Sequence, residues 1–118
     1  IPVDEGQTNP NLVHTKLKDF ISRNGTTSNW VEVAVSDNRN YATYSHELAA
    51  TSSDPMFHTD ENRWWVVLQG KIEWSIDGED SVVAEAGDVV FVEQGKNYSI
   101  STISNDPSIR ITIAAPVV

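Results

Sequence analysis

The spacing of hydrophobic positions changes once along the chain, near Trp30. Before that point, apolar residues recur at three-to-four spacing in one stretch. This predicts a short amphipathic helix over Leu12–Ile21, ended by the Asn24-Gly25 pair, with a strand as the alternative. The first ten residues, IPVDEGQTNP, are polar and aperiodic, so we expect them to form an arm. From Trp30 onward the period is two, which predicts strands.

Short β-rich runs fill the rest of the chain, and turn-forming residues separate them about every 8–12 positions, as expected of a sandwich or barrel. The Asp-Gly pair at 77–78 indicates a hairpin, because both central residues of a type I′ turn need positive φ. We therefore predict an all-β barrel over residues 30–118, with residues 1–29 forming an arm and short helix that pack on it. The runs are Trp30–Val35, Tyr41–Ala49, Arg63–Leu68, Lys71–Ile76, Ser81–Glu85, Val89–Val92, Tyr98–Ile103 and Ile109–Ala114.

The run from Trp64 to Leu68 is apolar on both faces of its predicted strand. A strand with one face in water does not easily tolerate this pattern, so we expect its outer side to be covered. Either the N-terminal segment or a second subunit would do so, and small all-β domains often solve the problem by pairing. We therefore expect a homodimer.

Charge and composition narrow the classes of partner. The 118 residues include eight basic and seventeen acidic side chains, and the formal charge of −9 repels phosphate backbones and anionic membrane surfaces. We expect neither nucleic acid nor a membrane as a partner, since no apolar run reaches the length of about 18–20 residues that a span requires. Without cysteine, thiol chemistry is excluded. Since no apolar run of that length is present, we expect a soluble protein. Because the chain starts at Ile1 and not at methionine, we expect it to be cytoplasmic or exported after leader removal.

Two glycine-anchored blocks carry a resemblance to a known family. Residues 63–70 read RWWVVLQG, and Gly87 is followed at a set spacing by Gly95 and Tyr98. These blocks resemble the cupins, small β-barrels with the motifs Gly-x5-His-x-His-x3–4-Glu-x6-Gly and Gly-x5-Pro-x-Gly-x2-His-x3-Asn. The resemblance covers residues 41–112 and implies a cupin-type jelly-roll barrel.

The same resemblance places this chain's residues at the family's metal-ligand positions. Met56 and His58 fall at the two histidine sites of the first motif. Arg63 falls at the glutamate site, and Tyr98 at the last histidine site. Only His58 remains a ligand, and a guanidinium cannot coordinate a divalent ion. We therefore expect no cofactor; the alternative is a divalent metal at a rearranged site that uses His46 and His58.

Strand alternation predicts which side chains line the barrel. The set is aromatic and apolar with one cation, a composition suited to a small ligand that is anionic or rich in oxygens. For the two tryptophans the alternative is plain core packing, and for His46 it is a hydrogen-bonded, partly buried histidine. For Arg63 it is a buried ion pair with one of the many carboxylates, for instance Glu93 or Glu47. The predicted pocket residues are Tyr44, His46, Met56, His58, Arg63, Trp65, Trp74 and Tyr98.

Three functions fit this pocket. A metal-free isomerase or lyase would use Arg63 to polarise a substrate carboxylate or carbonyl while His58 or Tyr98 moves a proton. A non-catalytic sensor or binding module would keep only the cavity. A metal-dependent dioxygenase or lyase would use the rearranged site at His46 and His58. We predict a small-molecule-binding barrel whose catalytic residues, if it is an enzyme, are His58, Arg63 and Tyr98.

Overall fold

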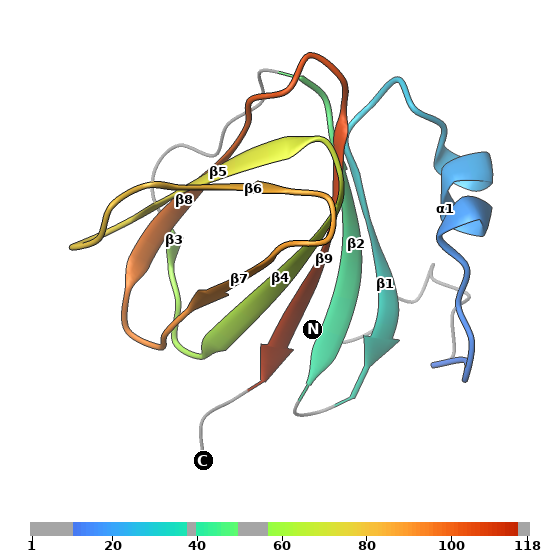
Figure 1. Cartoon of the computed structure of the whole chain (residues 1–118). Helices are drawn as coiled ribbons and strands as arrows, with labels where there is room; N and C mark the ends of the chain where they lie inside the picture. The colour runs from blue at the N-terminus through green and yellow to red at the C-terminus, as the bar shows by residue number, and fades with distance from the viewer. Residues whose placement is uncertain (1–10, 38–39, 50–56, 116–118) are drawn as a thin grey trace.

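The computed structural model describes residues 11–37, 40–49 and 57–115, which form two facing antiparallel sheets and one helix (Figure 1). The elements are α1 (Leu17–Asn24), β1 (Trp30–Ser36), β2 (Tyr41–Glu47), β3 (Phe57–His58), β4 (Asn62–Gln69), β5 (Lys71–Ile76), β6 (Val82–Glu85), β7 (Val89–Val92), β8 (Asn97–Thr102) and β9 (Ser108–Ala115). We call the five-stranded sheet, ordered β1-β2-β9-β4-β7, sheet A, and the four-stranded sheet, ordered β3-β8-β5-β6, sheet B.

The predicted strands are confirmed, each with ends within two residues of those observed. The strand β3 was not predicted, because two residues are too short to show a period. The predicted hairpin also forms, since β5 pairs with β6. Its turn is not type I′, however, because Gly78 has φ 81° whereas Asp77 does not have positive φ.

The helix α1 begins later than predicted, at Leu17 rather than Leu12. Leu12 and Val13 remain exposed instead of forming its apolar face, and Lys16 before the helix has extended backbone angles. The predicted end is confirmed. Gly25 has φ 81°, and its N–H donates to the Ile21 carbonyl at 2.7 Å, which closes the last turn.

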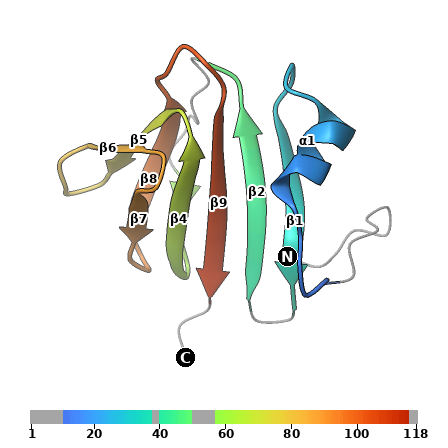
Figure 2. The same ribbon diagram turned by 45° about the vertical axis from the view of Figure 1, so that its right-hand side comes forward.

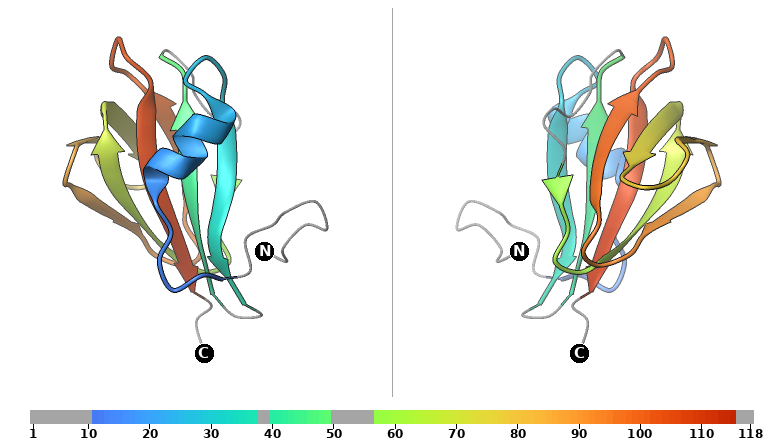
Figure 3. Two further views of the ribbon diagram at one scale, coloured as in Figure 1. Left: turned by 90° about the vertical axis from the view of Figure 1, so that its right-hand side faces the viewer. Right: turned by 90° about the vertical axis from the view of Figure 1, so that its left-hand side faces the viewer.

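Aromatic packing places α1 on the outer face of sheet A, over β1 and β2 (Figure 3). Phe20 is the one buried residue of the helix, and its ring lies 5.5 Å from that of Tyr44 on β2. Burying a phenylalanine side chain contributes roughly 1.5–3 kcal/mol, so this residue anchors the helix.

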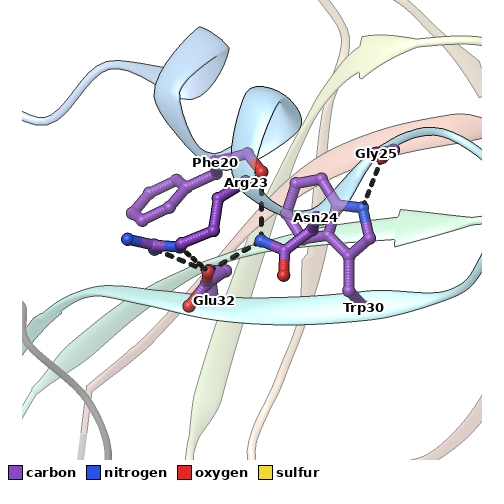
Figure 4. Close-up of polar contacts among 6 residues, drawn as sticks. All are labelled: Phe20, Arg23, Asn24, Gly25, Trp30 and Glu32. Atoms are coloured by element: carbon purple, nitrogen blue, oxygen red, sulfur yellow. Dashed lines mark hydrogen bonds and ion pairs between the residues drawn. The ribbon is translucent and has the colours of Figure 1, made fainter.

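Polar contacts with β1 fix the orientation of α1 (Figure 4). Arg23 Nη2 and Asn24 Nδ2 both donate to the same Glu32 carboxylate oxygen, at 2.6 and 2.7 Å. Trp30 Nε1 donates to the Gly25 carbonyl at 3.0 Å, which ties β1 to the end of the helix. These bonds satisfy groups at the C-terminal end of α1, a region where helices leave carbonyls unpaired.

The helix covers only the β1 and β2 end of sheet A, and β7 forms the opposite edge (Figure 2). On β4, β7 and β9 the outer face keeps several apolar side chains in contact with solvent. The described part of the N-terminal segment therefore does not cover the outer side of β4. The apolar residues of this outer patch are Trp64, Val66, Val89, Phe91, Ile111 and Ile113.

The core lies between the two sheets. Trp65 of β4 and Trp74 of β5 are 1% and 0% exposed, and their ring centroids are 5.5 Å apart. Side chains from β4, β5, β6, β7 and β8 surround them and close one half of the barrel. The core residues are Trp65, Val67, Ile72, Trp74, Ile76, Ala84, Val90, Val92, Tyr98 and Ile100.

Within the described part of the chain, no helix has the length and apolar character that a membrane span requires.

Candidate functional site

The inner face of sheet A carries polar side chains on β2 and β9. In antiparallel sheets directly paired residues share a face, and Arg110 pairs with the buried Val67 on one side and with Ser45 on the other. Thr112 likewise pairs with Trp65 and Thr43. These polar residues therefore face the barrel interior, beside the apolar core.

Arg63 stands on the same inner face of β4, as alternation predicts, and is 24% exposed. Its Nε donates to Thr59 Oγ1 at 3.2 Å, and its Nη2 donates to Glu61 at 3.2 Å. The guanidinium carbon also lies 5.8 Å from the centre of the Tyr41 ring. This environment matches the alternative prediction for Arg63, an ion pair with one of the chain's carboxylates. The partner is Glu61 rather than Glu93 or Glu47, because the loop before β4 folds back beside its first residues.

Two tyrosines accompany Arg63. Burial raises the pKa of Tyr98 above its ordinary value, and the charges of Arg63 and Arg110 oppose that rise. Burial also raises the pKa of Tyr41, again opposed by Arg63. Both phenols are therefore neutral near pH 7 and present hydroxyl groups that donate hydrogen bonds. Tyr98 is only 5% exposed and packs against Trp65 with ring centroids 5.1 Å apart.

A second arginine lies deeper and was missed by the sequence analysis. Arg110 Nη1 donates to the Glu47 carboxylate, and the two side chains are 12% and 16% exposed. Arg110 Nε is buried without a hydrogen-bond partner among the described residues. The indole N–H of Trp74 is also buried without a hydrogen-bond partner among these residues. Buried donors normally have acceptors, so these two need an explanation.

The predicted inward positions of Tyr44 and His46 are wrong. Both residues lie on the outer face of sheet A, beneath α1 and the loop that follows it. His46 stacks on Trp30 with ring centroids 5.3 Å apart, and its Nδ1 lies 2.8 Å from the Ser28 carbonyl. Since a carbonyl only accepts, Nδ1 carries the proton. The alternative prediction for His46, a hydrogen-bonded buried histidine, matches this environment; the exposed fraction is 1%.

His58 also lies away from the barrel interior. In the pairing of β3 with β8, Phe57 stands opposite the inward-facing Tyr98, and His58 stands opposite Asn97. His58 is exposed, its Nδ1 donates to Asn97 Oδ1 at 2.8 Å, and its Nε2 lies 3.4 Å from Asp60. Phe57 takes the inward place at the rim, with its ring 5.8 Å from that of Tyr98. Met56 lies outside the described residues.

The interior therefore brings together Arg63, Tyr98 and the two tryptophans of the predicted set. The tryptophans form the packed wall of the barrel, which matches the core-packing alternative. The side chains that the structure adds are Tyr41, Glu47, Glu61 and Arg110.

These residues do not fit the divalent metal that the resemblance implies. The described part of the chain contains no group of three histidine, aspartate or glutamate side chains able to hold a metal ion. His46 and His58 project from different sheets, both away from the interior. Two guanidinium groups face inward instead, and a guanidinium repels a cation rather than coordinating it.

Comparisons with known proteins agree on the fold. The chain matches no curated protein. Among solved structures, it resembles the cupin domain of Schizosaccharomyces pombe Cnp3, at 20% identity and TM-score 0.68, over 74% of this chain and 60% of that chain. It also resembles an RmlC-like cupin family protein from Methanocaldococcus jannaschii, at 14% identity and TM-score 0.70, over 79% of this chain and 84% of the other.

A third solved structure belongs to an enzyme, the DMSP lyase DddQ from Ruegeria pomeroyi DSS-3. It shares 14% identity and a TM-score of 0.66, over 77% of this chain and 52% of that one. Likeness at such identities concerns the fold and not the reaction. The family model described as "Cupin domain" matches residues 45–113, which is more than half of the chain. The chain therefore belongs to the cupin family, and its fold is the all-β jelly-roll barrel.

Proposed function

We propose that the barrel interior binds a small anionic or oxygen-rich molecule without a metal, through Arg63 and Arg110. The observation that carries this proposal is the buried Arg110 Nε, which has no acceptor among the described residues. A buried, charged donor left unsatisfied costs more than a typical hydrogen bond contributes, at least about 1–3 kcal/mol. A ligand oxygen in the barrel would remove this cost.

Arg110 is held ready for such a ligand. Glu47 accepts from Nη1 and fixes the guanidinium plane, while Nε remains available. A planar guanidinium with fixed orientation recognises carboxylate and phosphate oxygens well, because its donors form a rigid fork. The neutral hydroxyls of Tyr41 and Tyr98 supply further donors in the same region.

Arg63 would provide the second contact, nearer the rim. Its partner Glu61 is 24% exposed, so this carboxylate can turn into water when a ligand anion takes its place. Partly exposed ion pairs contribute only about 0–1 kcal/mol, so replacing Glu61 by the ligand anion costs little free energy. Glu61 therefore competes with the ligand, and its charge should weaken binding.

Non-catalytic binding is supported better than acid–base catalysis. The predicted base, His58, lies on the outer face of β3, where its two ring nitrogens contact Asn97 and Asp60. The raised pKa values of Tyr41 and Tyr98 favour hydrogen-bond donation over proton abstraction near pH 7. A protein that senses or carries a ligand needs only hydrogen-bond donors to hold it, and no general base.

Isothermal titration calorimetry with malonate, succinate and glutarate, on protein treated with EDTA, tests this proposal. We expect saturable binding of at least one dicarboxylate. Arg63→Gln should weaken it about tenfold or more, the loss expected for a charged hydrogen bond of roughly 1.5–3 kcal/mol. Glu61→Gln should strengthen it. Lys71→Gln removes the same charge from an exposed pair on β5 and should change nothing.

The proposal is overturned if no anion binds the EDTA-treated protein, or if the Lys71 and Arg63 variants lose affinity equally. Equal losses would mean that the net charge of the chain, and not a site in the barrel, controls binding. Restoration of binding by added zinc, iron or nickel would contradict the metal-free reading.

We also propose that the outer patch on β4, β7 and β9 pairs with a second copy of this chain. Its six residues include two aromatics, whose rings lie 5.4 Å apart, and it contains no charged side chain. Depletion of charge and enrichment of aromatics distinguish the centres of protein interfaces. A chain of net charge −9 repels its own copies, so a second copy would dock best through this uncharged face.

Sedimentation equilibrium tests the pairing with two identical substitutions. Val89 in the patch is 63% exposed and Val83, on β6 of sheet B, is 51% exposed. Val89→Lys should convert a dimer to a monomer, whereas Val83→Lys should leave the dimer intact. A monomeric wild-type chain would overturn the proposal, and so would equal effects of the two substitutions.

A further inference from the structure

A cavity lies outside the barrel, between α1 and the extended segment that precedes it. Its volume is about 170 Å³. None of its residues belongs to the barrel interior, so what binds there does not depend on the proposed barrel ligand. The lining residues are Leu12, His14, Thr15, Lys16, Asp19, Phe20 and Arg23.

The charge pattern at this cavity is unusual for the chain. Arg39 lies outside the described residues, and five of the other seven Lys and Arg side chains have a carboxylate partner within 4.0 Å. The two described cations without such a partner are Lys16 and Lys18, both at the start of α1. Of these two lysines, only Lys16 lines the cavity. In a chain of charge −9, an unpaired lysine is a local attraction for an anion.

Further groups favour the same ligand charge. Thr15 Oγ1 is buried without a hydrogen-bond partner among the described residues. Its hydroxyl can donate to an acceptor oxygen in the cavity. Arg23 adds a second cation, although Glu32 already binds it at 2.6 Å. Asp19 is the one carboxylate in the lining and opposes an anion.

The remaining lining sets the shape of the ligand. Leu12 and Phe20 provide apolar wall. An apolar protein cavity of about 150 Å³ accommodates a benzene molecule, so a volume of about 170 Å³ admits one ring. A ring-sized apolar body that carries a single acidic group matches both the wall and the charge.

We propose that this cavity binds a small monocarboxylate with a ring-sized apolar body. The carboxylate accepts a hydrogen bond from Thr15 and faces Lys16, and the ring lies against Leu12 and Phe20. This site and the barrel site take different ligand shapes, because the barrel's two arginines suit more than one acidic group.

Two-dimensional ¹H–¹⁵N NMR of the whole chain, titrated with benzoate, tests the assignment. We expect saturable shifts at residues 12–23, and weaker binding of benzyl alcohol, which lacks the charge. Lys16→Gln should raise the dissociation constant about three- to fivefold, as loss of a partly exposed ion pair predicts. Thr15→Val, which keeps the side-chain shape, should also raise it, and Asp19→Asn should lower it.

Lys18→Gln is the matched control, because it removes the same charge from the same helix outside the cavity. It should change the constant less than twofold. Absence of saturable shifts at residues 12–23 would overturn the proposal. So would equal binding of benzyl alcohol and benzoate, or equal losses in the Lys16 and Lys18 variants. Arg63→Gln should leave these shifts intact, which separates this site from the barrel.

Discussion

Replacement of Arg110 by methionine should reveal how firmly the interior arginine is held. The substitution leaves Glu47 as a carboxylate that is 16% exposed and has lost its partner. Removing one member of a buried pair costs about 3–5 kcal/mol, and the residual exposure of both side chains argues for the lower end. At about 4 °C per kcal/mol for a chain of this size, the melting temperature should fall by about 12 °C.

The double variant Arg110→Met with Glu47→Leu separates the charge effect from lost packing. Replacing both members of a buried pair by apolar side chains is often close to neutral, so most of the lost stability should return. The effects of the two single substitutions should therefore be far from additive in the full cycle. For comparison, Arg23→Met breaks a pair whose arginine is 52% exposed and should cost less than about 1 kcal/mol.

Urea titration followed by circular dichroism gives these free energies, provided that the slope with denaturant stays constant across the variants. A firmly held Arg110–Glu47 pair is refuted if Arg110→Met costs less than about 1 kcal/mol, since a buried unpaired carboxylate costs more than that. It is also refuted if the double variant is no more stable than the single one. A stable double variant would in addition provide a folded barrel without the deeper arginine.

Three further predictions concern stability. Burial raises the pKa of Tyr41 and Tyr98, so above about pH 10 the native state keeps phenol protons that the unfolded chain has released. The contribution of these two tyrosines to stability should therefore be constant below about pH 10 and fall above it, and Tyr98→Phe should flatten this fall in urea titrations. Gly70→Ala should cost about 2–4 kcal/mol, because a Cβ there would meet Ser104 Oγ at 2.8 Å and backbone at 3.1 Å at φ 83°, whereas Gly78→Ala, in open space at φ 81°, should cost only about 1 kcal/mol by differential scanning calorimetry. Glu32→Gln should weaken three hydrogen bonds to two residues of α1 and increase amide hydrogen exchange in the helix while leaving exchange in β4 unchanged.

Much of the fold is readable from periodicity. The change of period at Trp30 separates the helical segment from the strands, and the two-residue alternation within β4 places Trp65 and Val67 together in the core. The start of α1 was not predictable in this way. Leu12 and Val13 continue its apolar spacing but lie in exposed, extended chain, and a spacing pattern does not report burial.

The candidate site was less predictable, because alternation tells which residues share a face but not which face is inside. On β2 alternation placed Tyr44 and His46 on one face, which was predicted to look into the barrel, yet α1 covers that face. On β9 the isoleucines face outward and Arg110 faces inward, the reverse of the usual arrangement. A strand that alternates isoleucine with arginine and threonine was the available signal.

Family spacing introduced a different error, at His58. Motif alignment gives a residue's position along the chain but not the face of the sheet on which its side chain lies. A shift of one residue in the pairing of β3 with β8 would exchange the faces of Phe57 and His58. Phe57 occupies the inward position in the observed register, and no property of the sequence alone fixes that register in a two-residue strand.

Metal-free binding in the barrel can be observed at Arg110 itself, through its side-chain Nε–H resonance in ¹H–¹⁵N NMR of EDTA-treated protein titrated with the tightest-binding dicarboxylate. We expect this resonance to shift downfield and to exchange more slowly with water, with the same midpoint as the calorimetric binding curve, because the ligand oxygen accepts a hydrogen bond from it. An unchanged Arg110 resonance at saturation, or a shift that requires added metal, would mean that Arg110 does not bind the ligand in the metal-free barrel.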